Sequence, residues 1–111
     1  MSLEEFNPFT IQADATIQTA LLKIEENKYQ TLIVIDDKFR VLGTLTDGDI
    51  RKALISKRSL LAPVYDVMNT NYKSVVNKDD AKTIFAKHFY INLIPVISEQ
   101  GILQALAYRD K

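Results

Sequence analysis

The sequence has no cysteine, one histidine, three glycines and three prolines in its 111 residues. Without cysteine there are no disulfides, no thiolate metal ligands and no cysteine nucleophile. Basic and acidic residues are balanced at 14 each, so the chain lacks the positive charge typical of nucleic-acid binding. No apolar run is long enough to span a membrane, and the amino terminus lacks the pattern of a secretory signal. We therefore expect no metal, nucleic-acid or membrane partner and a cytoplasmic location.

A structural unit occurs twice along the chain. Each copy has two apolar strands in tandem, preceded by an amphipathic helix and a short extended segment. The strands are 32–36 and 41–45 in the first copy and 94–98 and 103–107 in the second, after extended segments at 10–11 and 74–75. The apolar residues of the two helices, spaced i, i+3, i+4, i+7, are Ile17, Ala20, Leu21 and Ile24, then Ala81, Ile84, Phe85 and His88. This spacing places each set on one helical face.

The repeat predicts the organisation of the chain. We expect a first repeat over residues 1–61, a linker at 62–65 that contains Pro63, and a second repeat over 66–111. The first copy ends in a further helix around Ile50, whereas the second ends before one. The predicted fold is therefore α+β, with two β-α-β-β-α repeats packed about a pseudo-twofold axis and the second lacking its last helix. The seam where the two repeats meet at this axis favours clefts between them.

A strand meets a helix within residues 43–51 of the first copy. The free N–H groups at the start of a helix, together with its dipole, favour an anion there. Thr46 can donate its hydroxyl to a phosphate, and the carboxylate of Asp49 can accept hydrogen bonds from ribose hydroxyls. The alternative to ligand binding is a purely structural role, because threonine and aspartate are also common at the first positions of helices.

Three stretches, residues 41–54, 66–68 and 93–97, resemble a tandem pair of CBS domains, also called a Bateman module. The resemblance implies a regulatory module that binds an adenine nucleotide (AMP, ADP or ATP), needs no metal and controls an attached enzyme. It also implies which residues contact the nucleotide. These are Gly43, Thr46 and Asp49 in the ligand motif, Leu32, Ile33 and Val34 beside the base, and Thr10 in the loop before the first helix.

The second copy departs from this ligand motif. When Gly43 is aligned with Ala105, Thr46 falls on Tyr108 and Asp49 on Lys111. Neither a tyrosine nor a lysine reproduces the carboxylate that would bind the ribose. We therefore expect at most one well-formed nucleotide site.

The missing closing helix suggests a piece cut from a longer enzyme. The first-copy motif is most similar to CBS pairs at the amino terminus of sugar-phosphate nucleotidylyltransferases, and it also resembles those of sugar-phosphate isomerases. A third possibility is a scaffold without ligand, since CBS pairs commonly form homodimers through their helices. We expect no catalytic residues in the chain itself, because it has no nucleophile paired with a base, no metal cluster and no Gly-rich phosphate loop.

Several other residues invite a functional interpretation. His88 falls on the apolar stripe of its predicted helix, which favours a packed histidine with one hydrogen bond over a catalytic one. Asp36 and Asp37 lie between two strands, where aspartate favours turn geometry. Phe89 and Tyr90 are candidates for a contact surface, because adjacent residues cannot both face the core.

Overall fold

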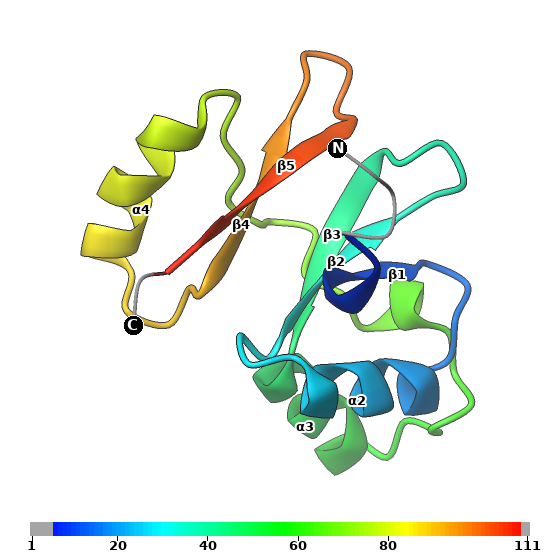
Figure 1. The fold of residues 1–111 in the computed structure, drawn as a ribbon. Coiled ribbons are helices and arrows are strands. Elements are labelled where there is room, and N and C mark those ends of the chain that lie inside the picture. The colour runs from blue at the N-terminus through cyan, green and yellow to red at the C-terminus, as the bar shows by residue number, and fades with distance from the viewer. Residues whose placement is uncertain (1–5, 110–111) are drawn as a thin grey trace.

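The computed structural model describes residues 6–109 (Figure 1). The first repeat consists of η1 (Asn7–Phe9), β1 (Thr10–Gln12), α2 (Ile17–Glu26), β2 (Thr31–Ile35), β3 (Val41–Thr46) and α3 (Asp47–Ile55). The second half consists of η2 (Val64–Asp66), η3 (Lys78–Asp80), α4 (Ala81–Lys87), β4 (Leu93–Ile97) and β5 (Leu103–Tyr108). The predicted α+β fold class is confirmed.

The first repeat is a three-stranded sheet covered by two helices. The strand order is β1-β2-β3, with β1 parallel and β3 antiparallel to β2. Thr16 caps α2 by accepting a hydrogen bond from the backbone N–H of Thr19 at 3.1 Å, which pairs an N–H that has no partner within the helix. The predicted apolar stripe of α2 is buried at Ile17, Ala20 and Ile24. These residues join Leu32, Val34 and Leu45 of the sheet in one core.

The second repeat has the same plan in a smaller form. Strands β4 and β5 are antiparallel, and Val75 forms a parallel bridge to Val96, as β1 does with β2 in the first repeat. Its core contains only five buried residues, which are Val75, Ala81, Ile94, Val96 and Ala107. The described residues end at Arg109, directly after β5.

Hydrogen bonds across the seam place the pseudo-twofold axis. Strands β4 and β5 begin 62 residues after β2 and β3, at Leu93 against Thr31 and Leu103 against Val41. The N–H of Val41 donates to the carbonyl of Gly101 at 2.9 Å, and the N–H of Leu103 donates to the carbonyl of Phe39 at 2.8 Å. Because Phe39 and Gly101 are equivalent positions, this exchange is reciprocal, as a twofold axis requires. Both residues have left-handed backbone, with φ of 62° and 82°.

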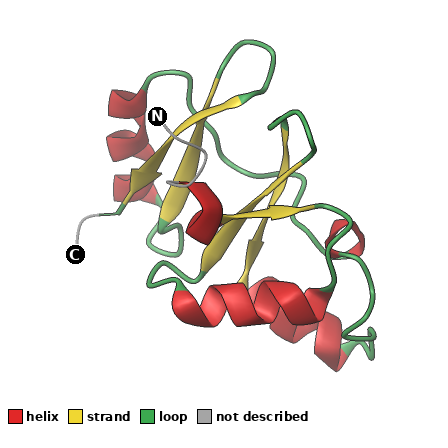
Figure 2. Cartoon of the chain, turned by 45° about the vertical axis from the view of Figure 1, so that its right-hand side comes forward, coloured by secondary structure: helices red, strands yellow, loops and turns green. Residues whose placement is uncertain are grey.

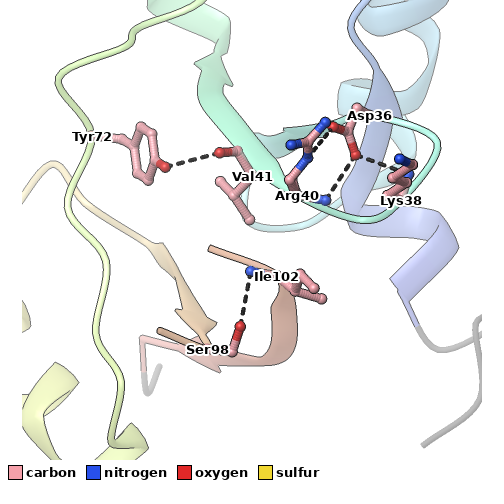
Figure 3. Close-up of polar contacts among 7 residues, drawn as sticks. All are labelled: Asp36, Lys38, Arg40, Val41, Tyr72, Ser98 and Ile102. Carbon is pink, nitrogen blue, oxygen red and sulfur yellow. Dashed lines mark hydrogen bonds and ion pairs between the residues drawn. The ribbon is translucent and has the colours of Figure 1, made fainter. Parts of the chain in front are cut away.

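The turns at the axis are equivalent as well (Figure 3). Oδ1 of Asp36 accepts hydrogen bonds from the N–H groups of Lys38 and Arg40, both at 2.9 Å, and Oγ of Ser98 accepts one from the N–H of Ile102 at 3.2 Å. The hydrogen bonds to Asp36, led by that from the backbone of Arg40, lower the pKa of its carboxyl. The predicted turn role of Asp36 is confirmed.

The two sheets pack against each other along this seam. One buried cluster joins Ile33, Ile35 and Val41 of the first sheet to Leu93, Leu103 and Leu106 of the second. Figure 2 shows α4 on the outer side of one sheet and α2 and α3 on the outer side of the other. The fold thus has three buried clusters, one inside each repeat and one between the two sheets.

Candidate functional site

Thr46 and Asp49 form a reciprocal cap at the start of α3. The hydroxyl of Thr46 accepts a hydrogen bond from the N–H of Asp49 at 3.2 Å, and Oδ2 of Asp49 accepts one from the N–H of Thr46 at 2.9 Å. The hydroxyl of Thr46 also lies 3.0 Å from the same Oδ2. The helix-start interpretation of these residues is therefore correct. Oδ1 of Asp49 makes no hydrogen bond with any residue from 6 to 109, so the cap leaves this oxygen available.

The same corner opens into a cleft of about 460 Å³ between the two halves. The cleft is lined by residues of both repeats and of residues 69–73, which lie between η2 and Val75 and are called here the connecting segment. The first repeat contributes Thr31, Thr44, Thr46, Gly48, Asp49 and Lys52; the connecting segment contributes Asn69, Asn71, Tyr72 and Lys73; and the second repeat contributes Tyr90, Ile91, Asn92 and Leu93. Its size is within the range of small-molecule sites, and its position at the seam is the one that the repeat predicted.

Tyr72 ties the wall of the cleft to the first sheet. Its hydroxyl donates a hydrogen bond to the carbonyl of Val41 at 3.1 Å (Figure 3). Burial raises the pKa of this phenol, so the hydroxyl stays protonated and the hydrogen bond persists at neutral pH. The ring is thus held as one of two aromatic groups on the cleft, the other being the exposed ring of Tyr90.

The remaining predicted contact residues lie elsewhere. Leu32, Ile33 and Val34 are completely buried, with 0% exposure, and pack in the two cores of the first sheet. The residue of β2 that lines the cleft is Thr31, at the start of the strand. Thr10 is also buried; its hydroxyl donates to the carbonyl of Phe6 at 3.1 Å, and it borders a separate hollow of about 320 Å³. Of the seven predicted residues, the structure thus brings Thr46 and Asp49 together at the cleft.

Gly43 permits a close backbone approach, but the approaching group belongs to the chain itself. A Cβ at this position would lie 2.8 Å from the carbonyl oxygen of Asn69 and 3.0 Å from Sδ of Met68. The neighbouring Thr44 exchanges two backbone hydrogen bonds with Asn69, at 3.0 and 2.8 Å. Gly43 therefore allows the connecting segment to pair with β3, and this pairing places Asn69 and Asn71 on the cleft.

Sequence reasoning missed most of the opposing wall. Residues 69–73 and 90–92 belong to irregular segments with no periodic pattern. Their position along the chain was one available signal, because residues 90–92 precede β4 as residues 28–30 precede β2, and the first residue of β2 pairs with Thr46. Tyr90 was predicted as a contact residue only from its place in a pair of aromatic residues, and it lines the cleft.

Aromatic side chains fill the position related to this cleft by the pseudo-twofold axis. Tyr108 takes the place of Thr46, Tyr29 that of Ile91, and Phe9 precedes β1 as Lys73 precedes Val75. The ring centroids lie 4.9 Å apart for Tyr29 and Tyr108 and 5.4 Å apart for Phe9 and Tyr108. Polar cleft residues are thus replaced by packed rings. Lys111, aligned with Asp49, lies outside the described residues.

His88 differs from its predicted setting. Helix α4 ends at Lys87, so His88 is the residue that follows the helix and not part of its apolar stripe. It is half-buried, and Nδ1 lies 3.1 Å from the hydroxyl of Tyr90. Within residues 6–109 no group of three histidine or acidic side chains is arranged to hold a metal ion. In the same range, every helix is too short or too polar to cross a bilayer.

Two pseudo-symmetric α+β repeats with a polar cleft at their seam define a small two-repeat module, and comparison with known proteins identifies its family. The family model described as CBS domain matches residues 3–56. The fold resembles the CBS domain pair of protein MJ0100, solved with 5'-methylthioadenosine and S-adenosyl-L-methionine, with a TM-score of 0.71 at 19% identity, over 91% of this chain and 84% of that one. Residues 3–56 thus match the CBS domain family, and the chain has the fold of a CBS pair.

Further relatives carry the same module. The structure of CBSX2 in complex with AMP matches with a TM-score of 0.73 at 25% identity, over 93% of this chain and 83% of that one. Inosine-5'-monophosphate dehydrogenase of Nitrosopumilus maritimus (strain SCM1) is 32% identical over 100 residues, which are 90% of this chain and 20% of the dehydrogenase. Arabinose 5-phosphate isomerase GutQ of Escherichia coli O6:H1 is 34% identical over 92 residues, 80% of this chain and 28% of the isomerase. The chain spans about a quarter of these two enzymes.

Proposed function

We propose that this CBS pair is a regulatory module that binds an adenine nucleotide in the cleft between its repeats. The observation that supports the proposal is the opening of the Thr46–Asp49 corner into a cleft whose other wall comes from the second repeat. A ligand that contacts both walls favours one arrangement of the halves, and this differential affinity is what regulation requires. The chain itself acts as a sensor and has no catalytic role.

The polar groups of the cleft suit the parts of a nucleotide. Oδ1 of Asp49 accepts the ribose hydroxyls, because Oδ2 already completes the helix cap. The phosphate lies at the start of α3, where Gly48 has no side chain to block it. The rings of Tyr72 and Tyr90 offer the base an aromatic surface.

One nucleotide binds per chain. The position related to the cleft by the pseudo-twofold axis holds the rings of Phe9, Tyr29 and Tyr108, and a tyrosine stands there in place of the hydroxyl of Thr46. A second ligand would have to displace these packed rings, whose contacts add to their area burial by about 0.5–1.5 kcal/mol per pair.

The regulated partner is an enzyme attached to the module. Support comes from the relatives, in which a similar module is part of a dehydrogenase or a sugar-phosphate isomerase. The sequence prediction gave a sugar-phosphate isomerase as the alternative host enzyme. The similarity of this chain to GutQ favours the isomerase over the nucleotidylyltransferase, for which these relatives offer no support. The cytoplasmic location stays a prediction.

Calorimetric and thermal titrations test the proposal. AMP, ADP or ATP should raise the melting temperature, because a ligand that binds only the folded state adds about 2.7 kcal/mol of stability at 100 times its Kd. Calorimetry should give one site per chain. Unchanged melting at millimolar concentrations of all three nucleotides would favour the ligand-free scaffold, and two equivalent sites would contradict the single-cleft proposal.

The module also forms a homodimer through its first-repeat helices. Five exposed aliphatic residues lie on α2, on α3 or just after α3, and they are Leu22, Leu54, Ile55, Leu60 and Leu61. A dimer formed through these helices would remove these apolar side chains from water. Ile55→Glu should therefore convert the dimer to a monomer in sedimentation velocity, whereas Val76→Glu, an exposed aliphatic position on the second repeat, should not. A monomeric wild-type chain would contradict this proposal.

A further inference from the structure

Lysines lie on two sides of the candidate cleft. Lys52 projects from α3 of the first repeat, and Lys73 comes from the segment that connects the repeats. Neither ammonium group makes a hydrogen bond or ion pair with any residue between 6 and 109. Both cations are therefore available to an anionic ligand, for which a charge-assisted hydrogen bond is stronger than a neutral one.

The cleft lining has less negative charge than positive charge, and part of the negative charge already accepts hydrogen bonds from the protein. Asp49 is the one acidic residue among the described lining residues, and its Oδ2 is held by Thr46. The other acidic residue in the first turn of α3, Asp47, pairs with Arg51 and does not line the cleft. The lining thus carries two cations against one carboxylate.

The spacing of residues along α3 places part of this positive charge beside the predicted phosphate position. Gly48 and Lys52 are four residues apart and Asp49 and Lys52 are three apart, so all three lie on one face of the nine-residue helix α3. The first turn of the helix carries partial positive charge. A ribose held at Asp49 therefore has its phosphates beside Gly48 and Lys52, and Lys73 supplies a further cation from the connecting segment.

We propose that this cleft selects nucleotides with a chain of two or more phosphates and discriminates against uncharged or cationic adenosine compounds, with Lys52 and Lys73 as the residues that set the preference. The inference rests on the proposed function. A single phosphate is satisfied by the start of α3, whereas a longer phosphate chain also reaches Lys52 and Lys73 and so joins the first repeat to the connecting segment. A sulfonium nucleoside brings a positive charge toward two unpaired ammonium groups and is disfavoured.

Calorimetry on the 111-residue chain at low ionic strength tests this preference. The ligands are adenosine, AMP, ADP, ATP and S-adenosylmethionine, without divalent cations. ADP and ATP should bind about tenfold more tightly than AMP, and S-adenosylmethionine more weakly than AMP. Lys52→Ala and Lys73→Ala should each reduce the ratio of ADP to AMP affinity at least threefold while leaving adenosine binding unchanged. Added salt should reduce the same ratio, because these lysines are exposed.

Lys78→Ala is the matched control, because Lys78 is an exposed lysine of η3 that does not line the cleft, and it should keep the full ratio. Equal affinity across the phosphate series, tighter binding of S-adenosylmethionine than of ADP, or an unchanged ratio in both lysine variants would overturn the preference while leaving nucleotide binding intact. Absence of binding by every adenosine compound would overturn the proposed function as well.

Discussion

Asp49→Ala should weaken nucleotide binding about 100-fold and lower the stability of the protein by about 1 kcal/mol. The binding loss follows from two ribose hydroxyls that lose a charged acceptor, at about 1.5 kcal/mol or more each. The stability loss follows from the reciprocal cap, in which Oδ2 of Asp49 accepts from the N–H of Thr46. Calorimetric titration of the nucleotide and thermal unfolding without ligand measure the two effects separately.

Two further variants separate the roles of the carboxylate. Asp47→Ala is the matched control. Asp47 is an acid in the same helical turn, but it pairs with Arg51 and does not line the cleft. This variant should change nucleotide affinity by less than threefold. Asp49→Asn keeps an acceptor oxygen for the cap and removes the charge, so it should recover most of the stability but little of the affinity. Full nucleotide affinity in Asp49→Ala would exclude this residue from the site.

The repeat and its symmetry could be predicted from the sequence, because they depend on local pattern. Strands in tandem and an amphipathic helix before each pair fix which face of each element is apolar, and two such sheets must bury those faces against each other. The corner at Thr46 and Asp49 could also be predicted, since a helix cap that follows a strand has a recognisable sequence pattern. The helix cap is confirmed, and it uses only one oxygen of Asp49, so ligand binding by this residue stays a prediction that the cap allows.

The opposing wall could not be predicted, because it depends on packing between distant segments. Asn69 reaches the cleft only because Gly43 lets the connecting segment pair with β3. Leu32, Ile33 and Val34 were assigned to the base from the family resemblance, yet a central strand between two cores leaves their side chains no exposed surface. The resemblance pointed to β2, of which Thr31, the first residue, lines the cleft.

The loss of polar contacts at the position related to the cleft by the pseudo-twofold axis was partly predictable. The alignment of Tyr108 with Thr46 indicated the loss of a polar contact, but it did not indicate what takes its place. The rings that meet Tyr108 come from Phe9 and Tyr29, far earlier in the chain, and only the packing of the two repeats brings them together. The asymmetry between the clefts is thus an outcome of tertiary structure.

Arg109→Ala should destabilise the second repeat by about 2–3 kcal/mol and weaken nucleotide binding with it. Nε of Arg109 donates to the carbonyl of Ile91 at 2.8 Å, and its NH2 group donates to the carbonyls of Phe85, at 2.9 Å, and His88. Its guanidinium also lies 5.0 Å from the centroid of the Phe85 ring. Removing the side chain takes this donor from the part-buried carbonyls of Phe85 and Ile91, whereas the carbonyl of His88 keeps the N–H of Ile91, and an unpaired buried group costs about 1–3 kcal/mol.

The effect should be local and should reach the cleft, because the second repeat has a small core and the loop held by Arg109 supplies Tyr90 and Asn92 to the lining. Hydrogen exchange should show faster exchange in α4, β4 and β5 and little change in α2. Arg109→Lys should lose most of the stability, since an ammonium group lacks the planar fork that reaches several carbonyls. Arg51→Ala, which removes an exposed arginine from a surface pair, should cost less than about 1 kcal/mol. Equal exchange in the two repeats of Arg109→Ala would show that the guanidinium does not hold this wall in place.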